Sequence, residues 1–226
     1  MKYFEARIKN ENDNKEPGPV ITISREYGCP SKILAGILVD KLNSMNQGSA
    51  PIPFKWKWIG RELLEESARD LKVDPKNIDH IFNYQERSIV DDILAATKKD
   101  GSYKSDLAIK KSVGKVIRSL GVTGHVVIVG RAGVVITRDI KKSLHIRLMA
   151  PLEWRINRVM NSENLSKEKA LSLITTKDAN RKRFLEYYLG QKFSIQIFDA
   201  IYNCEYFSLE EIADSMIVSM QQRKMI

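Results

Sequence analysis

An arginine stands between glycines directly after an apolar run of the sequence. Gly130-Arg131-Ala132-Gly133 follows the apolar positions 125–129. The planar guanidinium group of arginine can bind phosphate oxygens through two parallel hydrogen bonds, and neighbouring glycines let the backbone approach a ligand closely. Arg131 is therefore a candidate phosphate-binding residue. An arginine that caps a turn for structural reasons is the competing interpretation.

Two further groups of cations lie downstream. Arg155 and Arg158 are three positions apart in a predicted helix, so they would share one face and could together bind a phosphoryl group. The second group occupies a long basic helical pattern and consists of Lys177, Arg181, Lys182 and Arg183. Such a cluster is typical of a cationic lid over phosphates, but also of a nucleic-acid-binding stripe or a solvated helix face.

The loop after the first apolar run is a third candidate. Backbone N–H groups at a helix N-terminus can bind phosphate, and here Ser31 and Lys32 would add a hydroxyl and a cation. The loop is not the GxxxxGK[ST] motif, because Gly28 is its only glycine and Pro30 has no N–H to donate. A plain strand-to-helix turn is an equally good interpretation.

Short apolar runs predict the strands that would position these residues. They occupy positions 20–24, 54–59, 125–129, 144–149 and 198–203. Helical patterns alternate with them, most densely between 61 and 121. This alternation predicts a parallel sheet with helices on both faces, joined by right-handed crossovers. Ligands bind at the carboxyl ends of the strands in such sheets, where the candidate residues lie.

Several residues predict where helices begin and end. Ser166 would cap the long basic helix and Gly190 would end it. Ser208 with Glu211 three residues later predicts a capping box at the start of the last helix. Gly121 would end the helix before the third strand.

The composition limits the classes of protein to consider. The chain has 226 residues, 43% of them hydrophobic and 29% charged, and no apolar stretch approaches the roughly 20 residues of a membrane span. We expect a cytoplasmic protein with no membrane association, and a polar lead-in over residues 1–18. The net charge of +9 suits an anionic partner. Cys29 and Cys204 lack CxxC spacing and indicate neither a zinc site nor a disulfide framework.

An ordered set of segments resembles the cytidylate-kinase-like family. The segments are ITISREYG at 21–28, VIVGR at 127–131, APLEWRINRV at 150–159, Asp178 with Arg181 and YYLG at 187–190, and FDAIYN at 198–203. The resemblance covers roughly residues 20 to 220. It implies a P-loop NTPase-like three-layer α/β/α fold for residues 19–226, with a helical insertion at about 61–121 and a helical lid at about 162–192.

The resemblance also implies roles for the candidate residues. The loop from Ser24 to Lys32 would hold the phosphates of ATP, with Ser24, Arg25, Gly28, Ser31 and Lys32 in contact with the nucleotide. Arg131 and the segment after the second strand would hold a small anionic acceptor, and the lid would contribute Arg155, Arg158, Arg181 and Arg183. Mg²⁺ would accompany ATP, and no separate protein metal site is implied.

The chain departs from the family pattern at two places. The family's Gly-Ser-Gly-Gly-Arg run is replaced by Gly28-Cys29-Pro30-Ser31-Lys32, and its Asp-Arg-Glu-Leu run reads GREL at 60–63. Three hypotheses follow: ATP-dependent transfer to a phosphorylated acceptor such as CMP, a catalytically impaired nucleotide-binding regulator, and a nucleic-acid-binding module. The acceptor and the oligomeric state stay open.

Overall fold

The computed structural model describes residues 17–45, 55–60 and 106–226. The lead-in at 1–16 and most of the predicted helical insertion, including the segment after the second strand, lie outside these described residues.

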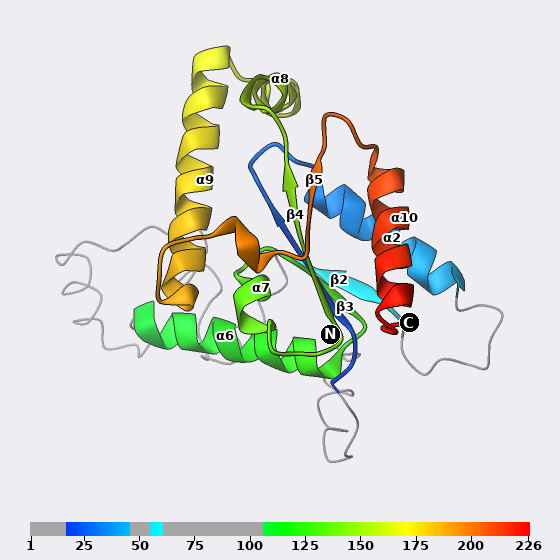
Figure 1. The fold of residues 1–226 in the computed structure, drawn as a ribbon. Helices are drawn as coiled ribbons and strands as arrows, with labels where there is room; N and C mark the ends of the chain where they lie inside the picture. The colour runs from blue at the N-terminus through cyan, green and yellow to red at the C-terminus, as the bar shows by residue number, and fades with distance from the viewer. Residues whose placement is uncertain (1–16, 46–54, 61–105) are drawn as a thin grey trace, which may run out of the picture.

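Five strands form one parallel sheet in the order β2-β3-β1-β4-β5 (Figure 1). The strands are β1 (Val20–Arg25), β2 (Lys57–Ile59), β3 (Val126–Val129), β4 (Ser143–Met149) and β5 (Ala200–Asn203). The apolar runs of β3, β1 and β4 form the central strands, which helices cover on both faces. Val20, Ile21 and Ile23 of β1, for example, are fully buried between β3 and β4.

Helices cover both faces of the sheet, as the alternation of elements predicts. They are α2 (Ser31–Met45), α6 (Asp106–Thr123), α7 (Gly133–Ile136), α8 (Leu152–Glu163), α9 (Lys167–Leu189) and α10 (Leu209–Gln222), with a 3₁₀ turn at Ile195–Ile197. On one face Leu38 of α2 and Met216 of α10 pack in a single apolar cluster with β1 and β4. On the other face, Ile117 of α6 and Phe184 of α9 pack against β3. The three-layer α/β/α prediction is confirmed.

The predicted helix ends are mostly confirmed. Ser166 accepts a hydrogen bond from Lys169 N at the start of α9, and Gly190 ends that helix with φ 66°. The capping box of Ser208 and Glu211 opens α10.

The prediction at Gly121 was wrong, because α6 continues to Thr123 and the chain turns at Gly124, where φ is 75°. Gly121 instead permits close packing of α6, since a Cβ there would lie 2.7 Å from Thr137 Cγ2.

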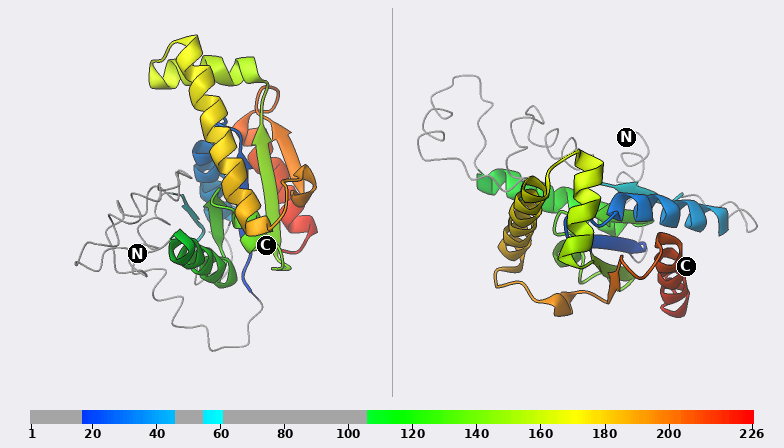
Figure 2. Two further views of the ribbon diagram at one scale, coloured as in Figure 1. Left: turned by 90° about the vertical axis from the view of Figure 1, so that its left-hand side faces the viewer. Right: turned by 90° about the horizontal axis from the view of Figure 1, so that it is seen from above.

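Helices α8 and α9 extend beyond the carboxyl edge of the sheet (Figure 2). Whether a helix could span a membrane depends on its length and its apolarity. Within the described parts of the chain, no helix is both long enough and apolar enough to span a bilayer.

Candidate functional site

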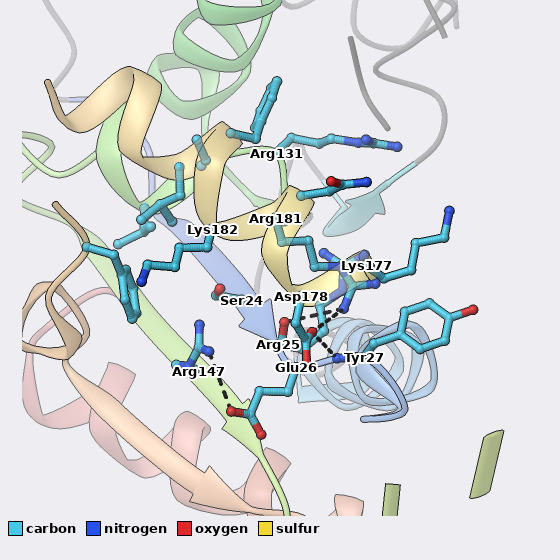
Figure 3. Close-up of a pocket in the computed structure, with 18 of the residues that line it drawn as sticks. Ser24, Arg25, Glu26, Tyr27, Arg131, Arg147, Lys177, Asp178, Arg181 and Lys182 are labelled. Atoms are coloured by element: carbon cyan, nitrogen blue, oxygen red, sulfur yellow. Dashed lines mark hydrogen bonds and ion pairs between the residues drawn. The ribbon is translucent and has the colours of Figure 1, made fainter. Parts of the chain in front are cut away.

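A cavity of about 490 Å³ lies at the carboxyl ends of β1, β3 and β4, against α9. Its cations come from four separate segments of the chain (Figure 3). They are Arg25, Arg131, Arg147, Lys177, Arg181 and Lys182, and the carboxylates among the lining residues are Glu26 and Asp178. Six cations against two carboxylates make the cavity strongly positive, which favours an anionic ligand with more than one negative charge.

Arg25 lies deep in this cavity because Gly130 leaves room for it. A Cβ at Gly130 would lie 2.0 Å from Arg25 Nη1, so the guanidinium group rests directly on the glycine backbone. Burial, together with repulsion from Arg181 and Arg131, lowers the pKa of Arg25 to about 9. The group is still protonated at neutral pH, and a bound anion would relieve the repulsion.

Arg131 enters the cavity from a backbone in an uncommon conformation. Both Arg131 and Ala132 have left-handed φ angles, of 57° and 54°. Gly130 N donates to Ile23 O at 2.9 Å and Gly133 N donates to Gly130 O at 3.0 Å, and these bonds hold the turn in place. Consecutive left-handed non-glycine residues cost free energy and are concentrated at functional sites. The turn that sequence reasoning singled out therefore has the geometry of a binding loop.

Arg181 approaches the same place from α9. Its Nη1 donates to Arg25 O at 3.4 Å, and its guanidinium carbon lies 5.0 Å from the centre of the Tyr27 ring. Burial lowers the pKa of Arg181, and the neighbouring Asp178 opposes that shift. The structure thus brings together Arg25, Arg131 and Arg181, three of the residues predicted from the sequence.

Arg155 is placed differently from Arg158. Arg155 is buried: Nε donates to Ala150 O at 3.1 Å, and Nη1 donates to Tyr27 O at 3.3 Å and to Asp178 Oδ2 at 2.7 Å. Arg158 is exposed, with its guanidinium carbon 5.6 Å from the centre of the Trp154 ring. The two arginines do not converge on one cavity in this structure.

Sequence reasoning missed Arg147, which lines the cavity from β4. Its guanidinium carbon lies 5.1 Å and 5.6 Å from the ring centres of Phe193 and Phe198, and Nη2 is 3.7 Å from Glu26 Oε1. Arginine–aromatic contacts of this kind fix the orientation of the guanidinium plane. The sequence did carry a signal for Arg147, because an arginine between apolar residues of a central strand, here Ile146 and Leu148, requires a polar surface at that point.

The loop after β1 uses much of its hydrogen-bonding capacity internally. Tyr27 N donates to Asp178 Oδ1 at 2.7 Å, Cys29 N donates to Glu26 O at 3.2 Å, and Ser31 N donates to Cys29 O at 2.9 Å. Pro30 has no N–H. In this conformation these backbone donors are not directed at a ligand, so the positive character of the site comes mainly from side chains.

The remaining predicted residues lie around the cavity in different environments. Ser24 lines it, whereas Gly28, with φ 96°, packs against Arg155. Ser31 is buried at the start of α2, and Lys32 and Arg183 are exposed on α2 and α9.

A comparison with protein families agrees, over most of the chain, with the resemblance found in the sequence. The family described as "Cytidylate kinase-like family" matches residues 20–205. The chain belongs to the cytidylate kinase-like family.

Individual relatives are more distant. A cytidylate kinase from Sulfolobus acidocaldarius is 33% identical over 82 residues, which is 36% of this chain and 44% of that protein, so the match spans less than half of the relative. A solved structure of an uncharacterized protein from Eubacterium ventriosum aligns with a TM-score of 0.63 and 20% identity, over 90% of this chain and 98% of the other. This structural likeness supports the α/β fold described above for this chain.

Proposed function

We propose that this family member transfers a phosphoryl group from ATP to a small phosphorylated acceptor, with nucleoside monophosphates such as CMP as the first class to test. The observation that carries the proposal is the cationic cavity at the carboxyl ends of the strands. Phosphoryl transfer requires mainly positioning and the stabilisation of negative charge, and clustered arginines provide both.

In this proposal Arg25, Arg131 and Arg181 bind phosphate oxygens in the cavity, and α8 with α9 form the lid. Arg158 and Arg183 would join them from the lid when it closes on ligand. For Arg155 the contacts favour a positioning role, because its guanidinium group is already engaged by Ala150 O, Tyr27 O and Asp178.

Magnesium would enter with ATP. Among the described residues, no group of three or more His, Cys, Asp or Glu side chains could hold a metal. Mg²⁺ commonly takes phosphate oxygens and waters with only one or two carboxylates. Glu26 lines the cavity, where its carboxylate pairs with Arg147 and Arg155, and it would have to exchange one of these partners to contact the ion. The residues therefore fit a nucleotide-borne ion, which neutralises charge on the phosphates when bound.

The test is turnover of the purified protein with ATP, MgCl₂ and a panel of nucleoside monophosphates, with phosphorylated product measured directly. Arg131→Ala should reduce kcat/KM by roughly 100-fold, the typical effect of removing one charge-stabilising donor. Arg138→Ala is the matched control, because Arg138 is an exposed arginine just after α7 that does not line the cavity. Equal turnover in the two variants would contradict the proposal.

A second candidate function is nucleotide binding without turnover. It is favoured by Pro30 and by the internal hydrogen bonds of Tyr27 N, Cys29 N and Ser31 N, which leave the loop poorly arranged for cradling phosphates. A thermal shift with ATP and Mg²⁺, but no product with any acceptor, would favour this function. No shift and no product, with retention on nucleic acid that falls steeply with salt, would favour the nucleic-acid hypothesis.

A further inference from the structure

The only two cysteines of the chain, Cys29 and Cys204, come together at the carboxyl edge of the sheet. Cys29 lies in the loop between β1 and α2, and Cys204 directly follows β5. Glu26 N donates to Leu148 O at 3.0 Å and Cys204 N donates to Met149 O at 2.8 Å. Both segments therefore leave the sheet beside the end of β4, one on each side of it (Figure 1).

The two thiols lie in one apolar cluster with Leu148 and Ala150. Each cysteine is 8% exposed and both thiols are free. Each thiol shifts the pKa of the other, as two neighbouring side chains do. This residual exposure suits a small oxidant rather than a bulky thiol reagent. The surrounding apolar packing holds both sulfur atoms in place.

The interaction between the two thiols shifts their pKa values in opposite directions. The hydrogen bond from Cys29 lowers the pKa of Cys204, assisted by the charge of Arg158 and opposed by burial and by Glu26. The pKa of Cys29 is raised by the same hydrogen bond and by burial, and Arg155 opposes this shift. Cys204 is therefore the better nucleophile of the pair, because the thiolate is the reactive form.

We propose that Cys29 and Cys204 are a redox-modification site, at which hydrogen peroxide converts the two thiols into one intramolecular disulfide that fixes the loop after β1 to the end of β5. Cys204 sulfur attacks one peroxide oxygen, the O–O bond breaks, and a sulfenic acid and one water form. Cys29 sulfur then attacks the sulfenic sulfur, the S–O bond breaks, and a second water leaves. The pair loses two electrons and two protons in total, and peroxide is reduced to two waters.

The bond has a structural consequence at the start of α2. A disulfide is about 2.05 Å long, shorter than any non-bonded contact between two sulfur atoms, so the loop after β1 and the end of β5 must draw together. Cys29 immediately precedes Pro30 and Ser31, where α2 begins. A covalent link here restricts local opening of the loop, which slows the exchange of its amide hydrogens. The site does not depend on the proposed phosphoryl transfer.

The experiment treats the full chain with stoichiometric hydrogen peroxide and then counts thiols after denaturation. We expect the two thiols per chain to fall to none, with the loss of two hydrogen atoms in the intact mass and full recovery after dithiothreitol. Peptide mapping should find Cys29 linked to Cys204 within one chain. Hydrogen exchange should slow in the peptide that contains Gly28 and Ser31.

Single variants test the assignment of the nucleophile. Cys29→Ser and Cys204→Ser each keep one thiol, so peroxide should add oxygen to that thiol instead of removing hydrogen. The serine hydroxyl of Cys29→Ser can still donate a hydrogen bond to Cys204, so we expect the remaining thiol of Cys29→Ser to react faster than that of Cys204→Ser. The measurements on the wild-type chain stand even if a variant does not fold.

Three results overturn the proposal. The first is that both thiols survive peroxide in the folded chain while the denatured chain is oxidised. The second is that the disulfide forms between two chains. The third is that hydrogen exchange in the loop is unchanged by the intramolecular disulfide.

Discussion

The carboxylate of Asp178 accepts a hydrogen bond from the backbone N–H of Tyr27 at 2.7 Å. Its other oxygen pairs with Arg155 Nη1, also at 2.7 Å. One side chain of α9 thus joins the loop after β1 to α8. The side chain of Arg155 is only 10% exposed, and Asp178 at 2.7 Å is a closer carboxylate partner for this buried charge than Glu26 at 3.4 Å.

Asp178→Asn should destabilise the fold by about 2 kcal/mol, in the range of hydrogen bonds to charged groups. The amide oxygen can still accept from Tyr27 N–H, so the loss reports on the charge beside Arg155. Urea unfolding measures it. Glu153→Gln is the control, because its pair with Lys167 is exposed and should contribute less than about 1 kcal/mol. Equal losses in both variants would show that Arg155 does not need this partner.

Gly130→Ala should weaken the binding of ATP or inorganic pyrophosphate by about tenfold or more, because the new Cβ displaces the Arg25 guanidinium group. Gly190→Ala is a matched control: that glycine also has positive φ, of 66°, but a Cβ there would have no neighbouring atom within 4 Å. Both variants carry similar backbone strain, of about 1–2 kcal/mol. Calorimetric titration would refute the role of Arg25 if the two variants bound equally well.

Arg147→Met should lower the affinity of the cavity for anions and keep most of the packing against Phe193 and Phe198. The expected loss is about 1.5 to 3 kcal/mol of binding free energy, the range for a charge-assisted hydrogen bond. Arg223→Met removes an arginine that is paired with Asp199 and does not line the cavity. Anion affinity that is the same in both variants would mean that Arg147 only supports the sheet.

His145 should make the protein less stable at acidic pH. Burial lowers its pKa to about 4 from 6.5, with Asp199 opposing and Arg223 and Arg138 adding to the shift. Between pH 6.5 and 4 the unfolded chain binds a proton at this position and the folded chain does not, so stability falls as pH falls. The total loss is about 3 kcal/mol.

His145→Asn tests this pH dependence by removing the titrating group. The asparagine can retain a partner for Thr22, whose hydroxyl lies 2.8 Å from His145 Nδ1. We expect lower stability at pH 7 and a flatter profile between pH 6.5 and 4, measured by urea unfolding. An unchanged slope would assign the acid sensitivity to other groups.

The strands and most helix ends were predictable because they depend on neighbouring residues. The run 126–129, predicted as 125–129, forms a buried strand through its own β-branched side chains, and the Ser208 box needs only Glu211 three residues later. The turn at Arg131 was recognised for the same reason, from the glycines on each side. The prediction that Gly121 ends its helix was wrong because this glycine serves close packing instead. It faces Thr137 at the end of α7, a residue that is remote from the local sequence pattern.

The parallel α/β fold, the family and the richness in cations along α9 could all be inferred from the sequence alone. Which of these cations share a cavity depends on the tertiary structure. Helical spacing places Arg155 and Arg158 together, but the position of Asp178 draws Arg155 inward. The contact between Cys29 and Cys204 likewise exists only because β1 and β5 flank β4. Periodicity records which face of a helix or strand is apolar, whereas ion pairs and thiol contacts depend on distances between segments that are remote in the chain.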